Sequence, residues 1–154
     1  MSCVFCDIVS GDIPCHKIWE DASHLAFLSS RPNTLGFSVV IPKKHLSSYL
    51  FAQQQDDINA LIYASKQVGL LLDRALDGVA RTGMIFEGYG VDHLHAKLFP
   101  MHGTGDSSEF KKISSNVDKY FGHYEGYISS HDGKREDYDK LAKLAAQIRD
   151  ISHA

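Results

Sequence analysis

The sequence of 154 residues contains no apolar run of the roughly 18 to 20 residues that a membrane span requires. It also has no excess of positive charge, because 16 Lys and Arg residues stand against 19 Asp and Glu residues. Nucleic-acid backbones are bound through basic surfaces, so this balance argues against bulk electrostatic binding of DNA or RNA. We therefore expect neither a membrane nor a nucleic acid as a partner.

Two further absences bear on the cellular compartment. The segment Met1–Asp7 lacks the charged-then-apolar layout of a secretory signal. The chain has only three cysteines, an odd number that does not suggest a disulfide framework. These features favour thiols or metal ligands in a reducing compartment, and we expect a cytoplasmic protein.

The chain shows no internal repeat, low-complexity tract or Pro/Ser-rich linker that would mark a domain boundary. We expect one domain over residues 1–154, with a core of about residues 3–102 and a C-terminal extension of about residues 103–154. The apolar share of 44% is ordinary for a globular chain of this length, which needs no disulfide scaffold.

The apolar pattern predicts short strands and amphipathic helices. A long central helix is expected over residues 58–76, ended by Gly78, and a C-terminal helix over residues 138–151, initiated near Asp132. The expected strands are residues 16–19, 24–28, 36–41, 83–87 and 93–99. Because strands and helices do not alternate strictly, the pattern favours an α+β fold with a mainly antiparallel sheet.

Histidine is abundant, with nine residues, and its most informative occurrence is at the start of the last predicted strand, residues 93–99. On a strand, His93, His95 and Lys97 would share one face, while the apolar residues between them point into the core. Imidazoles and an ammonium on a rigid strand form a platform suited to phosphate. The alternative is a half-exposed strand whose polar side faces water. Isolated histidines elsewhere are expected at the surface: His16, His24 and His153.

A second group of candidate residues lies at the N-terminus. Cys3 and Cys6 form a Cys-x-x-Cys pair, the spacing that zinc sites use, and a complete site needs two more ligands. The alternative is a pair of reduced thiols near a chain end, with Val4 and Phe5 packing into the core.

The segment Gly88–Pro100 resembles the motif His-x-His-x-His-x-x followed by Pro of the histidine-triad (HIT) superfamily of nucleotide hydrolases and transferases. Further blocks are similar to that family in order and spacing: residues 3–14, 18–21, 25–28 and 40–45. The resemblance runs from Cys3 to Pro100. It implies a HIT-like fold, a homodimer, and a nucleotide or dinucleoside polyphosphate as ligand.

The resemblance also implies roles for individual residues. His95 matches the nucleophile, which attacks the α-phosphorus to form a phosphohistidine. Lys97 stands where the family has its third histidine, and we expect it to stabilise charge on phosphate during catalysis. Ser29 stands where many members place an acidic residue that holds the ribose hydroxyls. The expected substrate contacts are Phe5, Ile8, Ile18, Phe27, Ser29 and Lys97.

For the metal, the resemblance implies a closed zinc site made of Cys3, Cys6, His45 and His93. Such a site is structural and ties the N-terminus to the motif. No organic cofactor is expected.

The sequence thus predicts an enzyme that hydrolyses or transfers a nucleotide at its α-phosphate. Two other interpretations stay open. Lys97 and Ser29 depart from the family pattern, which suits a nucleotide-binding module without turnover. Alternatively, His93 and His95 could hold a catalytic zinc in a metal hydrolase.

Overall fold

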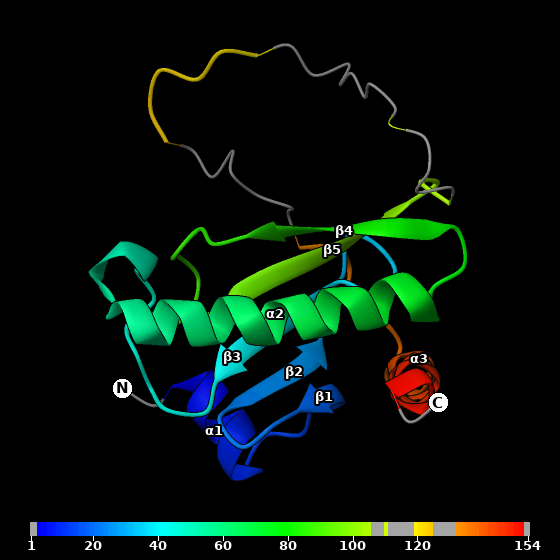
Figure 1. The fold of residues 1–154 in the computed structure, drawn as a ribbon, viewed down its shortest axis with the longest axis horizontal. Coiled ribbons are helices and arrows are strands. Elements are labelled where there is room, and N and C mark those ends of the chain that lie inside the picture. The colour runs from blue at the N-terminus through cyan, green and yellow to red at the C-terminus, as the bar shows by residue number, and fades with distance from the viewer. Residues whose placement is uncertain (1–2, 106–109, 111–118, 125–131, 153–154) are drawn as a thin grey trace.

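The computed structural model describes residues 3–105, 110, 119–124 and 132–152. Its centre is an antiparallel five-stranded sheet with strand order β1-β2-β3-β5-β4. The strands are β1 (His16–Glu20), β2 (His24–Leu28), β3 (Ser38–Pro42), β4 (Val79–Ile85) and β5 (Ala96–His102). The helices are α1 (Val4–Ser10), η1 (Leu50–Ala52), α2 (Gln55–Ala75) and α3 (Tyr138–Ser152). This is the expected α+β architecture with a long central helix and a C-terminal helix (Figure 1).

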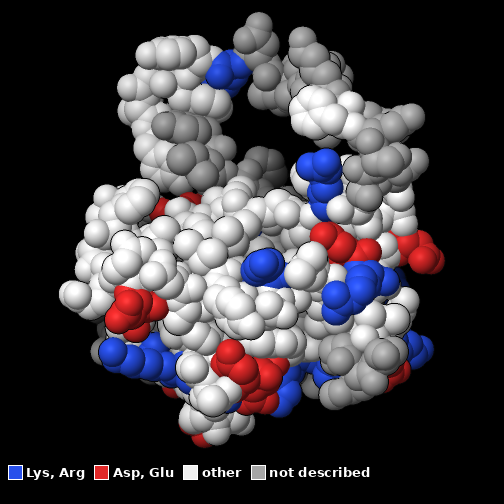
Figure 2. All heavy atoms as spheres, viewed as in Figure 1, with Lys and Arg blue, Asp and Glu red and all other residues white. Residues whose placement is uncertain are grey.

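Helices α2 and α3 cover one face of the sheet, where the larger apolar cluster lies. From β5 and the residues before it, Leu94, Ala96 and Leu98 contribute to this cluster, as the alternation predicts. Helix α2 places its apolar stripe against them: Leu61, Ala64, Val68, Leu71, Leu72 and Ala75. On the face of the molecule where α2 lies in front, acidic and basic side chains are interspersed and do not form a patch of one sign (Figure 2).

The opposite face of the sheet is partly covered by α1. Phe5 of α1 packs against a second apolar cluster that includes Phe27 and Val39. Helix α1 ends at Gly11, whose φ of 88° is readily adopted by glycine and whose N–H donates to the carbonyl of Ile8. The side chains of this second cluster form the base on which the candidate site is built.

The structure corrects two expectations about local sequence. Helix α3 is capped by Asp137, whose carboxylate accepts the N–H of Lys140 at 3.0 Å, and not initiated near Asp132. His24 is not at the surface: it is 5% exposed, on strand β2, whose residues are all buried. The surface expectation for His153 lies outside the described residues. Among the described residues, no helix has both the length and the apolar character needed to cross a membrane.

Candidate active site and metal centre

The motif histidines lie in a bend just before β5 and not on the strand itself, because β5 begins only at Ala96. The N–H of Leu94 donates to the carbonyl of Leu46 at 2.8 Å, which holds this bend against the loop after β3. The two histidines nevertheless lie on the same face of the sheet, as the alternation predicts. The Phe5 ring contacts the His93 and His95 rings, with centroids 5.8 and 5.4 Å apart, on the face opposite α2.

His95 is held in one orientation by the backbone of its own motif. Its Nδ1 lies 2.7 Å from the carbonyl oxygen of His93. A carbonyl only accepts, so Nδ1 carries the proton and Nε2 presents the lone pair. Burial, together with the Lys97 charge, lowers the pKa of His95, so the imidazole is neutral near pH 7. A neutral, oriented imidazole is equipped to act as a nucleophile.

His95 lines a cavity of about 520 Å³, within the roughly 300 to 1,000 Å³ typical of small-molecule sites. Lys97 lines the same cavity, as do other residues expected to contact the substrate: Phe5, Ile8, Phe27 and Ser29. The hydroxyl oxygen of Ser29 accepts the N–H of Arg31 at 3.2 Å. The cavity therefore brings together the candidate nucleophile, a cation and an apolar base.

Ile18 does not belong to this cavity. It is 1% exposed and lies in the cluster beneath α2, on the other face of the sheet. The pairing of β1 with β2 shifts register between Lys17 and Trp19, and both Ile18 and Trp19 contact that cluster. The family resemblance implied a substrate contact for Ile18, but at this bulge its side chain lies in the core beneath α2 and not among the residues that line the cavity.

Lys97 has a partner that the sequence reasoning did not identify. Its Nζ forms an ion pair with Oε1 of Glu87, and both side chains are largely buried. Strand pairing brings Ile85 opposite Lys97, which places Glu87, two residues beyond, near the ammonium. A predicted register for the pairing of β4 with β5 would have been the signal for this contact in the sequence. The consequence of this ion pair is that the charge of Lys97 is balanced by a carboxylate of the same chain.

Cys3, Cys6, His45 and His93 come together as the resemblance implies. Their ligand atoms all lie within 4.8 Å of one another. The Sγ–Nδ1 distances are 3.3 Å for Cys3–His93, 3.4 Å for Cys6–His45 and 3.6 Å for Cys6–His93. A tetrahedral zinc ion with ordinary bond lengths separates sulfur and nitrogen ligands by about 3.6 Å. The cluster therefore fits zinc in both donor type and spacing.

The orientation of His93 completes this fit. Its Nε2 donates to the carbonyl of Pro42 at 2.8 Å, which directs the Nδ1 lone pair toward the thiols. Burial lowers the pKa of His93 and keeps the ring neutral, the form that binds a metal. Two thiols and two imidazoles would supply all four ligands of a tetrahedral zinc ion, which is the donor set of a closed, structural site. His95 is outside the cluster, and this arrangement gives the zinc-hydrolase alternative no support.

The α+β fold thus carries an oriented histidine at the wall of a cavity and a Cys2His2 cluster beside it. The model of the HIT domain matches residues 10–104, and the chain belongs to this family. The family match ends before the C-terminal part of the chain, including α3.

Relatives agree with this assignment. The chain is 32% identical over 120 residues to an uncharacterized HIT-like protein of Methanocaldococcus jannaschii, covering 75% of this chain and 92% of that protein. It is 35% identical over 100 residues to adenosine 5′-monophosphoramidase of Schizosaccharomyces pombe, covering 65% of this chain and 74% of that protein.

Solved structures show the same fold. A hypothetical histidine triad nucleotide-binding protein from Sulfolobus tokodaii superposes with a TM-score of 0.73 at 22% identity, covering 98% of this chain and 92% of that one. A Zn-bound histidine triad family protein from Mycobacterium smegmatis superposes with a TM-score of 0.69 at 25% identity, covering 98% and 93%. Both coverages extend over α3, beyond the region that the family model matches.

Proposed function

We propose that the protein is a nucleotide phosphohydrolase or nucleotidyl transferase that acts at the α-phosphate of a nucleotide or dinucleoside polyphosphate. The observation that carries this proposal is His95: a neutral imidazole with Nδ1 bonded to a carbonyl and its ring at the wall of a ligand-sized cavity. The S. pombe relative, an adenosine 5′-monophosphoramidase, supports a reaction at a nucleotide phosphorus.

In the proposed reaction, the Nε2 lone pair of His95 attacks the α-phosphorus and forms a P–N bond. The bond between phosphorus and the leaving group breaks, and the leaving group takes the electron pair. The ring then carries positive charge, which the Nδ1–H bond to the carbonyl of His93 stabilises. Water or another acceptor attacks phosphorus, the P–N bond breaks and His95 is restored.

Lys97 and Glu87 act beside this centre. The proposed role of Lys97 is to donate to a phosphate oxygen as negative charge develops there. Because Glu87 already balances the ammonium, the substrate phosphate must share Lys97 with that carboxylate. The charge available to the substrate is therefore smaller than that of an unpaired lysine.

For the cluster of Cys3, Cys6, His45 and His93, we propose structural zinc. Zinc bound there would join the N-terminal helix to the motif and supply no reacting group. The Zn-bound relative from M. smegmatis supports this assignment. We also propose a homodimer in the cytoplasm, on the basis of the family membership and the reduced thiols.

Trapping the intermediate tests the proposal. The protein is incubated briefly with α-³²P-labelled ADP and diadenosine polyphosphate, quenched in alkali and digested. We expect an acid-labile, alkali-stable label on the peptide that contains His95. His95→Ala should abolish the label, while the matched control His102→Ala, an exposed histidine at the end of β5, should retain it. Nucleotide binding without any label would favour the binding module without turnover.

A further inference from the structure

One wall of the His95 cavity comes from outside the region that the HIT family model matches. Residues 10–104 carry the match, yet Asp132, Arg135 and Tyr138 also line the cavity. The Tyr138 ring contacts the ring of His16, with centroids 4.3 Å apart, and His16 lines the cavity as well. The residues just before α3 are therefore part of the cavity that holds the candidate nucleophile.

This wall is anchored to the loop between β2 and β3. The N–H of Gly133 donates to the carbonyl of Arg31, and the N–H of Glu136 donates to the carbonyl of Ser30, both at 3.1 Å. A Cβ atom added at Gly133 would clash with the carbonyl oxygen of Pro32. The approach of the two backbones therefore requires glycine at this position.

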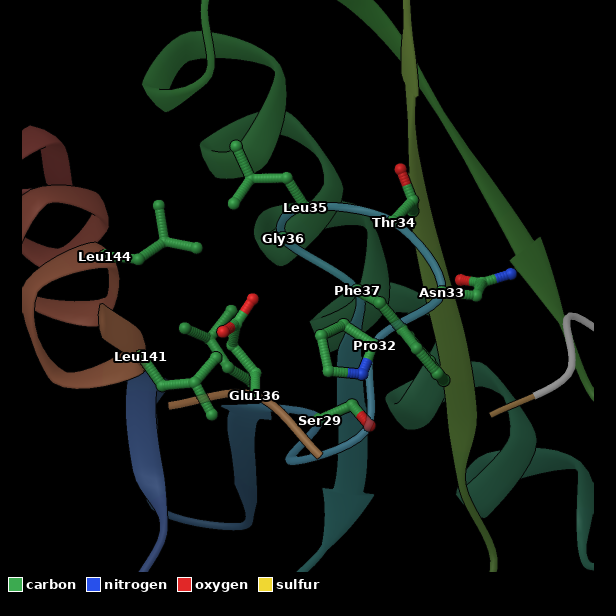
Figure 3. A pocket seen from close by; sticks show the side chains of 11 residues that line it. Ser29, Pro32, Asn33, Thr34, Leu35, Gly36, Phe37, Glu136, Leu141 and Leu144 are labelled. Carbon is green, nitrogen blue, oxygen red and sulfur yellow. The ribbon is translucent and has the colours of Figure 1, made fainter. Parts of the chain in front are cut away.

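The contact between this wall and the loop after β2 also borders a second cavity, of about 250 Å³, which is lined by the loop, by Glu136 and by residues of α3. Figure 3 shows Leu141 and Leu144 of α3 and the side chain of Glu136 facing the loop that carries Leu35. The wall thus continues directly into a helix that packs on the sheet, and its position is fixed by α3 as well as by the loop.

The wall also changes the charge of the cavity. Arg31 from the loop and Arg135 from the wall both line it. Among the described residues neither guanidinium forms an ion pair with a carboxylate, whereas Lys97 is paired with Glu87. Asp132, which also lines the cavity, carries one negative charge. Guanidinium groups bind phosphate oxygens in a bidentate manner, which suits them to a ligand with more than one phosphate.

We propose that residues 132–138 form a specificity-determining wall, in which Arg135 acts together with Arg31. They bind the anionic groups of the substrate that extend beyond the phosphate attacked by His95. The inference rests on the proposed function and deepens it. It favours nucleoside diphosphates, triphosphates and dinucleoside polyphosphates over nucleoside monophosphates and their amidates.

The test separates binding from chemistry by using the full chain with His95→Ala. Dissociation constants for AMP and for α,β-methylene-ADP are measured by calorimetry in this background. Adding Arg31→Gln or Arg135→Gln should weaken α,β-methylene-ADP by about tenfold and AMP by less than about twofold, because only the former has a second phosphate. The matched control is Arg81→Gln, an exposed arginine on β4, which should change neither constant.

A second variant moves the wall without removing a charge. Gly133→Ala should displace the wall from Pro32 and reduce the preference for α,β-methylene-ADP over AMP by about fivefold or more. Gly69→Ala in α2, where an added Cβ has nothing within 4 Å, is its control. Equal losses for both nucleotides, or no loss, would overturn the inference while leaving the proposed function intact. Absence of binding by both nucleotides in the His95→Ala background would overturn the inference and the proposed function together.

Discussion

Replacing Cys6 with serine should remove the metal from the N-terminal cluster. Cys6 Sγ lies 3.4 Å from Nδ1 of His45 and 3.6 Å from Nδ1 of His93, so it contacts both imidazole ligands. A serine hydroxyl is not deprotonated near neutral pH and is a poor zinc ligand. Cys6→Ser would leave an incomplete site that connects α1, the loop after β3 and the motif bend less firmly.

The size of the effect follows from binding to the folded state alone. Free zinc at 100 to 1,000 times its dissociation constant stabilises the native state by about 2.7 to 4.1 kcal/mol. In a domain of this length, 1 kcal/mol corresponds to roughly 2 to 4 °C in melting temperature. Cys6→Ser should therefore lower the melting temperature by about 5 to 16 °C relative to the zinc-loaded protein.

Metal analysis and thermal unfolding measure the two parts of this prediction. The wild type should carry about one zinc ion per chain, and Cys6→Ser should carry almost none. Cys15→Ser is the matched control, because Cys15 is a free cysteine outside the cluster and its loss should leave zinc content unchanged. A chelator should reproduce the shift in the wild type and have little effect on Cys6→Ser. The reasoning fails if reduced wild type takes up no zinc, or if Cys6→Ser retains it.

Three other predictions concern the proposed nucleophile His95, its neighbour Lys97 and the closely packed Gly36. His95→Ala should lower kcat by at least about a thousandfold with unchanged circular dichroism, and a residual tenth of the activity would exclude His95 as nucleophile. In steady-state kinetics, Lys97→Ala should lower kcat/KM for polyphosphates by roughly ten- to a thousandfold and for a phosphoramidate by less. Adding Glu87→Gln to Lys97→Ala should restore part of the loss. Equal losses for both substrate classes would contradict a contact between Lys97 and the leaving group. Gly36→Ala should destabilise the fold by about 1 to 3 kcal/mol in urea unfolding, because φ is 84° and an added Cβ would lie 2.6 Å from Cδ1 of Leu76. Unchanged stability would show that Leu76 repacks freely.

The sequence predicted correctly those features that periodicity or residue spacing produces directly, namely which face of an element is buried and where a long helix lies. The alternation around His95 placed Leu94 on the α2 face and His93 on the other, even though the strand begins later than expected. The 3.6-residue period defined α2 to within a few residues. The Cys-x-x-Cys spacing left a metal site and a pair of reduced thiols as alternatives, and only the family resemblance named His45 and His93 as the other candidate ligands.

The features that the sequence did not reveal depend on contacts between distant segments. Helix α1 was not expected, since a helix this short is stabilised by the packing of Phe5 and not by its own propensity. The burial of His24 arises because β2 is an interior strand covered on both faces, which five residues of sequence cannot indicate. Glu87 meets Lys97 through strand pairing, and Arg135 reaches the cavity through the docking of the C-terminal segment; no local pattern encodes either contact.

Three of the polar groups of His93 have different tasks. Its Nδ1 faces the thiols, its Nε2–H is bonded to Pro42, and its carbonyl fixes the proton on His95. Any oxidation or alkylation of Cys3 or Cys6 would therefore act on the same residue that orients His95, the proposed nucleophile. The reactivity of the cavity histidine and the chemical state of the N-terminal thiols are consequently joined through one amino acid. Preparations that differ in thiol oxidation should differ in specific activity although no residue of the nucleotide cavity has been chemically changed.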